Sequence, residues 1–279
     1  MIPYRYINTK GCEQLYPVYY TDYMEPHLAP DKPNRYLVLH EVPCRYNGNW
    51  NVDIQWPRYK GLITWNPIIF EEYKDRFNMV FSDQFQNMRI DMLEVEPYIP
   101  LSDRQHDVCC VYGPPASRDT PIMMARYDLP LFLSSAGMSV NAYGTIPNTS
   151  RPEFRPTWSG IFSGPLPAYG KRSGLIKHKF SVAFENSRHP RWAAGWVTEK
   201  IYDCLGSGTV PIYWGAPDVT DYIPPEVFID YREFDTNEDL YKYLTTTPAS
   251  VFEKMSKDGV DFFNTVHFDK YLDVYENLP

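Results

Sequence analysis

Apolar, strand-like runs alternate with helix-like segments along most of the chain. RYLVLHE, NMVFSD and TVPIYWG have the character of buried strands, whereas NEDLYKYLTTT and PASVFEKMSKDGVDFF have the spacing of amphipathic helices. Strands that alternate with helices are joined by crossover connections, so they form parallel sheets covered by helices. The alternation therefore predicts an α/β fold.

A break in this pattern near residue 107 divides the chain into two units. We predict two Rossmann-like, doubly wound domains that face a cleft, residues 1–106 and residues 107–279. The closing segment, HFDKYLDVYENLP, fits a short helix that can cross back to the first domain.

Proline and glycine indicate where individual elements begin and end. PIIFEEYKDRF fits a helix, and so does RDTPIMMARYDLPLFLSSAG, in which Pro130 should kink or split the helix. Residues 145–175 are rich in Pro, Gly and Ser, which indicates a long loop. LIKHKFSVAFEN is expected to be a strand, TEKIYDCLGSG a helix capped by Thr198, and YIPPEVFIDYREF a source of one short strand.

Charge and composition exclude several classes of protein. The net charge of −8 argues against nucleic acid or an anionic membrane surface as a partner. No apolar run approaches the ~18–20 residues of a membrane span, and the opening MIPYRYINTKGCEQLYP lacks the apolar core of a signal peptide. We therefore expect no membrane span and a cytoplasmic location. The five irregularly spaced cysteines fit neither a disulfide framework nor a zinc site.

Polar residues gather at three consecutive edges in the segment FENSRHPRWAAGWVTEKIYDCLGSGTVPIYWGAP. Glu185 and Asn186 follow one strand, Glu199 and Lys200 begin a helix, and Gly215 follows the next strand. In a parallel sheet such edges lie on one side, where ligands bind. A helix start beside a lysine suits phosphate, and a glutamate in the same turn can accept hydrogen bonds from sugar hydroxyls. Together these residues indicate a site for a nucleotide-linked sugar.

The same segment resembles the signature of the α1,3/4-fucosyltransferases. The shared pattern is FxxxFENS, a short loop, TEK, and a glycine before VPIxxGxP, and YIPPEVFIDYREF further along also fits. The resemblance covers roughly residues 107–240. It implies a GT-B fold whose first domain, residues 1–106, binds the acceptor and whose second domain, residues 107–279, holds the nucleotide sugar. It also implies an inverting reaction without a catalytic metal or other cofactor. No D-x-D pair that could chelate a metal through a diphosphate occurs in the chain.

The resemblance also implies roles for individual residues. Lys200 and an arginine in the preceding helix would stabilise the departing diphosphate; Arg126 fits the family's spacing, and Arg118 is its rival. Glu199 would face the sugar and stabilise its developing positive charge, whereas Glu185 would orient the loop. The implied donor-binding residues are Arg126, Gly144, Glu185, Asn186, Ser187, Trp196, Thr198, Lys200 and Tyr213. Of these, Asn186 would hydrogen-bond phosphate or sugar, and Trp196 would stack on the base or sugar.

An inverting transfer needs a general base, which is expected in the first domain. Glu41 ends the strand YLVLHE, where the family has its candidate base, and His40 is the competing residue. The catalytic residues predicted by the resemblance are therefore Glu41 and Glu199.

The identity of the donor stays open at this point. The ten residues from Arg188 to Val197 form a longer turn than is usual in the family, and they are expected to border the donor sugar. The partners would be a nucleotide sugar, GDP-fucose or a relative such as UDP-xylose, and a glycan acceptor. A non-catalytic nucleotide-sugar or glycan-binding protein and a retaining two-domain glycosyltransferase are the alternatives.

Overall fold

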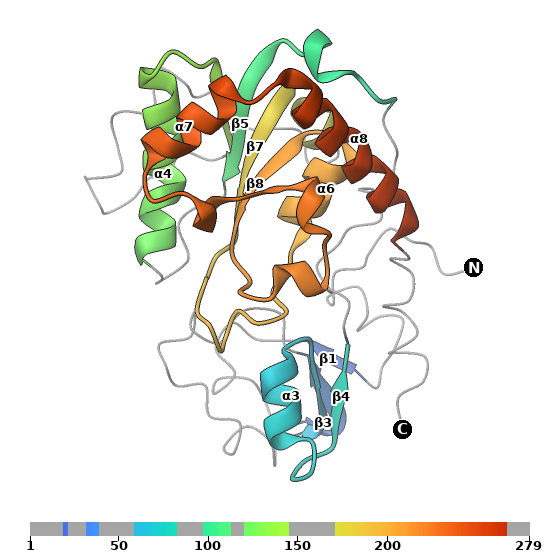
Figure 1. Ribbon diagram of the computed structural model, residues 1–279. Coiled ribbons are helices and arrows are strands. Elements are labelled where there is room, and N and C mark those ends of the chain that lie inside the picture. The colour runs from blue at the N-terminus through green and yellow to red at the C-terminus, as the bar shows by residue number, and fades with distance from the viewer. Residues whose placement is uncertain are drawn as a thin grey trace.

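Two parallel β-sheets form the framework of the molecule (Figure 1). The computed structural model describes residues 19–21, 32–38, 59–82, 97–112, 120–144 and 171–266. The first sheet contains, in order, β1 (Tyr19–Thr21), β2 (Lys32–Val38), β3 (Tyr59–Thr64) and β4 (Met79–Phe81). The second contains β5 (His106–Tyr112), β6 (Val140–Gly144), β7 (His178–Phe184), β8 (Val210–Trp214) and β9 (Ile229–Asp230).

The second sheet is doubly wound. Its strand order is β6-β5-β7-β8-β9, and all its neighbours pair in parallel. The chain moves outward from β5 to β6 and then returns past β5 to β7, so the order reverses between β5 and β7. Sheets of this kind bind ligands beside such a reversal, at the carboxyl ends of the strands. The described strands of the first sheet instead follow sequence order, so they wind in one direction.

Helices cover both faces of the second sheet (Figure 1). The helices of the described residues are α3 (Pro67–Tyr73), α4 (Thr120–Ser135), α5 (Lys171–Leu175), α6 (Glu199–Gly206), α7 (Asn237–Thr246) and α8 (Ala249–Thr265). Helix α4 packs near α7, whereas α6 packs against α8. Helix α3 belongs to the first sheet and packs on β3 and β4. None of the helices in the described ranges is long and apolar enough to cross a membrane.

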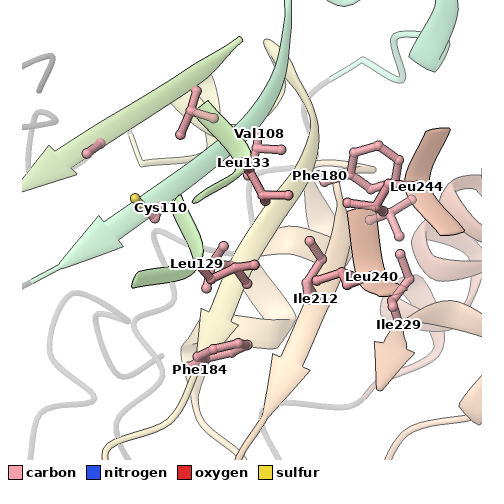
Figure 2. Packing of buried hydrophobic residues seen from close by; sticks show 14 of the residues in the cluster. Val108, Cys110, Leu129, Leu133, Phe180, Phe184, Ile212, Ile229, Leu240 and Leu244 are labelled. Carbon is pink, nitrogen blue, oxygen red and sulfur yellow. The ribbon is translucent and has the colours of Figure 1, made fainter. Parts of the chain in front are cut away.

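The core of the second sheet follows the period of two that strands impose. Phe180 and Phe184 of β7 face one cluster with Ile212 of β8, while Ala183 and Tyr213 face a second cluster on the other side. Figure 2 shows the first cluster, where side chains of α4 and α7 meet those of the strands. Both faces are therefore apolar and buried, as in a parallel sheet sandwiched between helices.

The predicted α/β fold with parallel sheets is confirmed, but several element boundaries differ. Helix α4 continues through Pro130 without splitting, because Leu129 and Leu133 on either side are fully buried against the sheet. Residues 171–175, predicted as loop, form α5. Helix α3 ends at Tyr73, earlier than predicted.

The segment YIPPEVFIDYREF contributes only the two residues of β9, with short 3₁₀ helices on either side. The closing segment HFDKYLDVYENLP lies outside the described residues, so its return to the first domain stays a prediction. The two predicted domain boundaries also stay a prediction, although the two sheets divide between Phe81 and His106.

Candidate active site

The carboxyl ends of β7 and β8 meet the start of α6 at one edge of the second sheet. Glu185 follows β7 directly, and its backbone N–H donates to the Trp214 carbonyl at the end of β8 at 2.8 Å. Thr198 is the N-cap of α6, and its hydroxyl accepts from the Lys200 backbone N–H at 3.3 Å. The structure thus brings together four predicted site residues, which we call the rim: Glu185, Thr198, Glu199 and Lys200.

The Glu185 carboxylate is the centre of the rim. It is fully buried, and it accepts hydrogen bonds from the Thr198 backbone N–H at 2.7 Å and from the Thr198 hydroxyl at 2.8 Å. The Lys200 ammonium donates to it at 3.1 Å. Burial raises the pKa of Glu185, and Lys200 and the Thr198 donors oppose this rise. Glu185 therefore orients the start of α6.

The Lys200 ammonium lies between two carboxylates. Its Nζ is 3.1 Å from Glu185 Oε2 and 3.7 Å from Glu199 Oε1, and it donates to the Thr198 hydroxyl at 2.9 Å. The Lys200 side chain is 20% exposed and that of Glu199 is 25% exposed, so both groups can reach a ligand in solution. Burial acts to raise the pKa of Glu199, but Lys200 and Lys171 outweigh it and hold that pKa below its usual value. The rim thus presents a fixed cation beside an ionised carboxylate.

Gly215 leaves the space that the Glu185 side chain occupies. A Cβ at Gly215 would lie 2.3 Å from Glu185 Cγ and 2.6 Å from the Tyr213 hydroxyl, so any side chain there displaces one of them. The Tyr213 hydroxyl accepts from the Ala216 N–H at 3.1 Å, and burial raises the pKa of Tyr213. Tyr213 is fully buried. Tyr213, predicted to bind the sugar donor, therefore lies beneath the rim and supports the backbone of the rim.

Arg126 projects from α4 to the end of β7. Its Nε donates to the Phe184 carbonyl at 3.0 Å, its Nη2 donates to the same oxygen, and its Nη1 donates to Asn186 Oδ1 at 3.0 Å. The side chain is nearly buried. A buried guanidinium presents several donors in a fixed fork, which suits a phosphate oxygen. The predicted residues Arg126 and Asn186 are therefore in direct contact beside the rim.

Two further residues predicted to bind the sugar donor are Gly144, at the end of β6, and Ser187, three residues after β7. Gly144 ends β6 with a φ of 122°, a conformation that favours glycine. Ser187 is buried, and its hydroxyl accepts from the His189 N–H at 3.2 Å. This bond orders the start of the long turn that follows.

The long turn, residues 188–197, packs against the first sheet, and we call it the bridging turn. Trp196 was predicted to stack on the donor, but it is 1% exposed and its ring lies against Trp65, with ring centroids 4.6 Å apart. The Asn66 side-chain amide donates to the Arg191 and Trp192 carbonyls at 2.9 and 3.3 Å. The turn therefore joins the two sheets. Its predicted position beside the donor sugar stays untested.

The residues predicted as general base are not among those that the structure describes. Glu41, His40 and the alternative arginine Arg118 lie outside the described residues. Among the described residues, no group of three or more His, Cys, Asp and Glu side chains is arranged to hold a metal ion. The absence of a catalytic metal stays a prediction of the sequence.

A second cation lies near the rim that the sequence pattern does not predict. Lys171 of α5 forms an ion pair with Asp203, which lies one turn after Glu199 on α6 and is fully buried. The burial of Asp203 is not predicted by the sequence either, because a charged residue within a helix usually faces solvent. On α6, Asp203 follows Glu199 at the i+4 spacing and is flanked by apolar residues. This pattern is the signal that could have revealed the buried ion pair.

Comparison with known proteins identifies relatives of the second half of the chain. Residues 123–251 match the family model of the glycosyltransferase family 10 (fucosyltransferase) C-terminal region. An alpha-(1,3)-fucosyltransferase of Helicobacter pylori is 31% identical over 118 residues, which cover 39% of this chain and 24% of the relative. An alpha-(1,4)-fucosyltransferase of Arabidopsis thaliana is 40% identical over 70 residues, 25% of this chain and 16% of the relative. The match thus spans about a quarter or less of these relatives, and it confirms the resemblance that the sequence indicates.

Solved structures extend the likeness of the fold to both sheets. An alpha1,3-fucosyltransferase solved with GDP-fucose has a TM-score of 0.55 at 19% identity and matches 90% of this chain and 78% of its own. The beta-glucosyltransferase of phage T4, solved with UDP-glucose, has a TM-score of 0.52 at 11% identity over 87% of this chain and 72% of its own. These neighbours are GT-B glycosyltransferases, so the predicted fold class is confirmed.

Proposed function

We propose that this chain, which carries a glycosyltransferase family 10 (fucosyltransferase) domain at residues 123–251, is an inverting, metal-independent glycosyltransferase. It moves L-fucose from GDP-fucose to a hydroxyl of a glycan. The observation that carries the proposal is the rim, where Lys200 lies between two carboxylates at the start of α6. The GDP-fucose bound by a structural neighbour supports this choice of donor.

The rim and Arg126 supply what the departing diphosphate requires. As the bond between the anomeric carbon and the phosphate oxygen breaks, its electron pair passes to the diphosphate. The Lys200 ammonium, the Arg126 guanidinium and the backbone N–H groups at the start of α6 are fixed donors for that charge. Their positions are set before the reaction by Glu185, Asn186 and the Phe184 carbonyl.

The Glu199 carboxylate supports the other half of the transition state. The anomeric carbon gains positive charge as the donor bond breaks, and an ionised carboxylate at the rim stabilises it. The acceptor oxygen forms the new bond from the opposite face and gives its proton to a general base. We propose Glu41 as that base from its place in the sequence.

An activity assay with several donors tests the function. The protein is incubated with GDP-fucose and UDP-xylose, each with an acceptor glycan and EDTA, and release of nucleotide is followed. We expect transfer with GDP-fucose, undiminished by EDTA, and a product with inverted configuration by NMR. Transfer from UDP-xylose alone would replace the donor, and a retained configuration would overturn the inverting mechanism. Binding of GDP without turnover would indicate a non-catalytic binding protein.

Single substitutions assign the roles. Lys200→Ala and Glu199→Ala are each expected to lower kcat by about 100-fold, the usual effect of removing one charged group that stabilises the transition state. Glu41→Ala is expected to abolish transfer while donor binding, measured by calorimetry, is kept. Lys254→Ala is the control, because this lysine is 75% exposed and pairs only with Asp258 among the described residues. Unchanged turnover in Lys200→Ala would remove the proposed contact with the diphosphate.

A further inference from the structure

The bridging turn makes a contact with the first sheet that uses every polar group of one buried side chain. Asn66 is fully buried between β3 and α3. Its Oδ1 accepts from the Ile69 N–H at 2.9 Å, which caps α3, and its Nδ2 donates to the Arg191 and Trp192 carbonyls of the turn. The Asn66 amide therefore caps α3 through its oxygen and links the first sheet to the bridging turn through its nitrogen.

The backbones of the two parts also touch. Gly195 has a φ of 74°, and a Cβ there would lie 2.6 Å from the Trp65 carbonyl and 3.1 Å from Pro67 Cδ. Its N–H donates to both carboxylate oxygens of Asp218, at 2.9 and 3.0 Å, so the second half of the chain holds it in place. The rings of Trp65 and Trp196 and the methyl group of Ala193 form a buried apolar cluster at the same point.

The contact leads directly into the rim. Trp196 stands two residues before Thr198, whose backbone N–H and hydroxyl both donate to Glu185. The bonds between Thr198 and Glu185 lie within the second half of the chain and do not involve Trp65 or Asn66, so the rim can keep its geometry when the contact is lost. The exposed ion pair between Arg191 and Glu72 lies at the edge of the same contact.

We infer that the bridging turn fixes the first sheet relative to the rim, that Asn66 is its principal positioning residue, and that the contact persists through turnover. This inference rests on the proposed function. Its consequence is that the acceptor, which the first half is proposed to hold, meets the donor at a distance set by this turn. Loss of the contact should separate donor use from transfer, because the donor site remains but the acceptor is no longer aligned.

The Asn66→Asp variant tests the positioning role. Aspartate keeps the oxygen that caps α3 but replaces the donor to the turn by an oxygen that faces two carbonyls. We expect kcat/KM for the acceptor to fall by about tenfold or more, the factor for two lost hydrogen bonds, while donor KM changes by less than about twofold. The ratio of transfer to donor hydrolysis should fall with it. A lowered melting temperature with an unchanged ratio would mean that Asn66 is merely structural.

The Glu72→Gln variant is the matched control. It removes the ion pair with Arg191, whose partners are 40% and 36% exposed, and such pairs contribute little. We expect activity within about twofold of the unchanged protein. A loss as large as that of Asn66→Asp would transfer the positioning role from the amide to the ion pair, and would overturn the assignment.

A reversible cross-link tests whether the contact persists. Cysteines at the positions of Glu72 and Arg191, whose long side chains meet at their ends, are joined by a bis-methanethiosulfonate cross-linker that a reductant cleaves, with each single cysteine variant as control. We expect the cross-linked protein to keep at least about half of its turnover, because the two positions need not separate. Loss of turnover that a reductant restores would show that the halves must move apart here.

Amide hydrogen exchange separates this inference from the proposed function. Exchange is measured without ligand in Asn66→Asp and in the unchanged protein, and the Ile69 amide should stay equally protected in both, because aspartate still caps α3. We expect exchange across residues 188–197 to quicken in Asn66→Asp. Unchanged exchange across residues 188–197 would contradict the positioning role of Asn66. If the unchanged protein turned over none of the donors, that result would contradict the proposed function alone.

Discussion

At the scale of single residues, the rim depends on the space left by one glycine. Glu185 can reach Thr198 and Lys200 only because Gly215 has no side chain at a point 2.3 Å from Glu185 Cγ. The backbone conformation of Gly215 is not the reason for its presence, since its φ is not in the left-handed region. The reason is the close approach of a carboxylate to the backbone.

The Gly215→Ala variant should therefore lose donor binding. The added methyl group displaces Glu185 or the Tyr213 hydroxyl, and Lys200 then loses its buried partner. We expect donor affinity to fall by about tenfold or more, since a charge-assisted hydrogen bond is lost, as measured by calorimetry with GDP.

Gly137→Ala is the control: its φ of 99° strains the alanine, but nothing lies within 4 Å of the added Cβ. It should lower the free energy of unfolding by about 1 kcal/mol with GDP affinity kept, and equal GDP affinity in both variants would contradict the steric argument.

At the scale of elements, α6 carries charge on two successive turns. Glu199 begins the helix, Asp203 follows one turn later, and Lys171 of α5 pairs with Asp203 while its charge also acts on Glu199. Lys171 is thus a second cation that keeps Glu199 ionised.

Substitutions of the pair should shift the pH dependence of activity in different ways. Lys200 and Lys171 hold the pKa of Glu199 low, so Lys171→Met should raise that pKa and move the acid limb of kcat/KM to higher pH. Asp203→Asn removes a neighbouring negative charge and should not move the limb upward. Both variants should be less stable, because each leaves a partner of the pair uncompensated. An identical acid limb in all three proteins would exclude an effect of Lys171 on Glu199.

Element types follow closely from the sequence, and their limits depend on tertiary contacts. The alternation of apolar runs and amphipathic segments predicts the parallel sheets, because each period of two or 3.6 reports which faces are buried. It cannot report that packing on the sheet holds α4 together across Pro130. It also treats Asn66 as the end of a strand, although an asparagine directly before a proline is a recognisable helix N-cap.

At the scale of the whole molecule, a buried histidine links stability to pH. His178 at the start of β7 is fully buried between the Gly174 carbonyl, 2.9 Å from Nδ1, and the Asn141 side-chain nitrogen, 3.0 Å from Nε2. The neutral ring satisfies both neighbours, since Nδ1 donates and Nε2 accepts. Burial lowers the pKa of His178 to about 4.

The folded protein should therefore lose stability in acid through this residue. Above pH 6.5 the ring is neutral in both states; between pH 6.5 and about 4 only the unfolded chain binds the proton, so unfolding is favoured as the pH falls. We expect His178 to account for about 2 kcal/mol of the stability lost between pH 7.5 and pH 4.5. The measurement is urea unfolding at both pH values for the unchanged protein and His178→Gln. Equal pH dependence in the two proteins would show that His178 does not contribute.

The sequence predicts which site residues lie close together when they are near one another in the chain, but not contacts between distant segments. The order of strand end, helix start and strand end places Glu185, Glu199 and Lys200 on one edge, because parallel strands share their carboxyl side. The position of Trp196 was not predictable, because its partner Trp65 lies far away in the sequence. The same holds for Lys171, whose role depends on how α5 packs against α6.

The double use of Asn66 also limits how such proteins can be recombined. A hybrid that joins the first half of this chain to the second half of a relative would cut between the sheets, yet leave Trp65 and Asn66 facing a foreign turn. That amide would then meet carbonyls at other positions, or none, although each half kept its own core. A working hybrid should therefore take residues 64–67 and residues 188–197 from the same parent, even though they lie on opposite sides of the break between the two sheets.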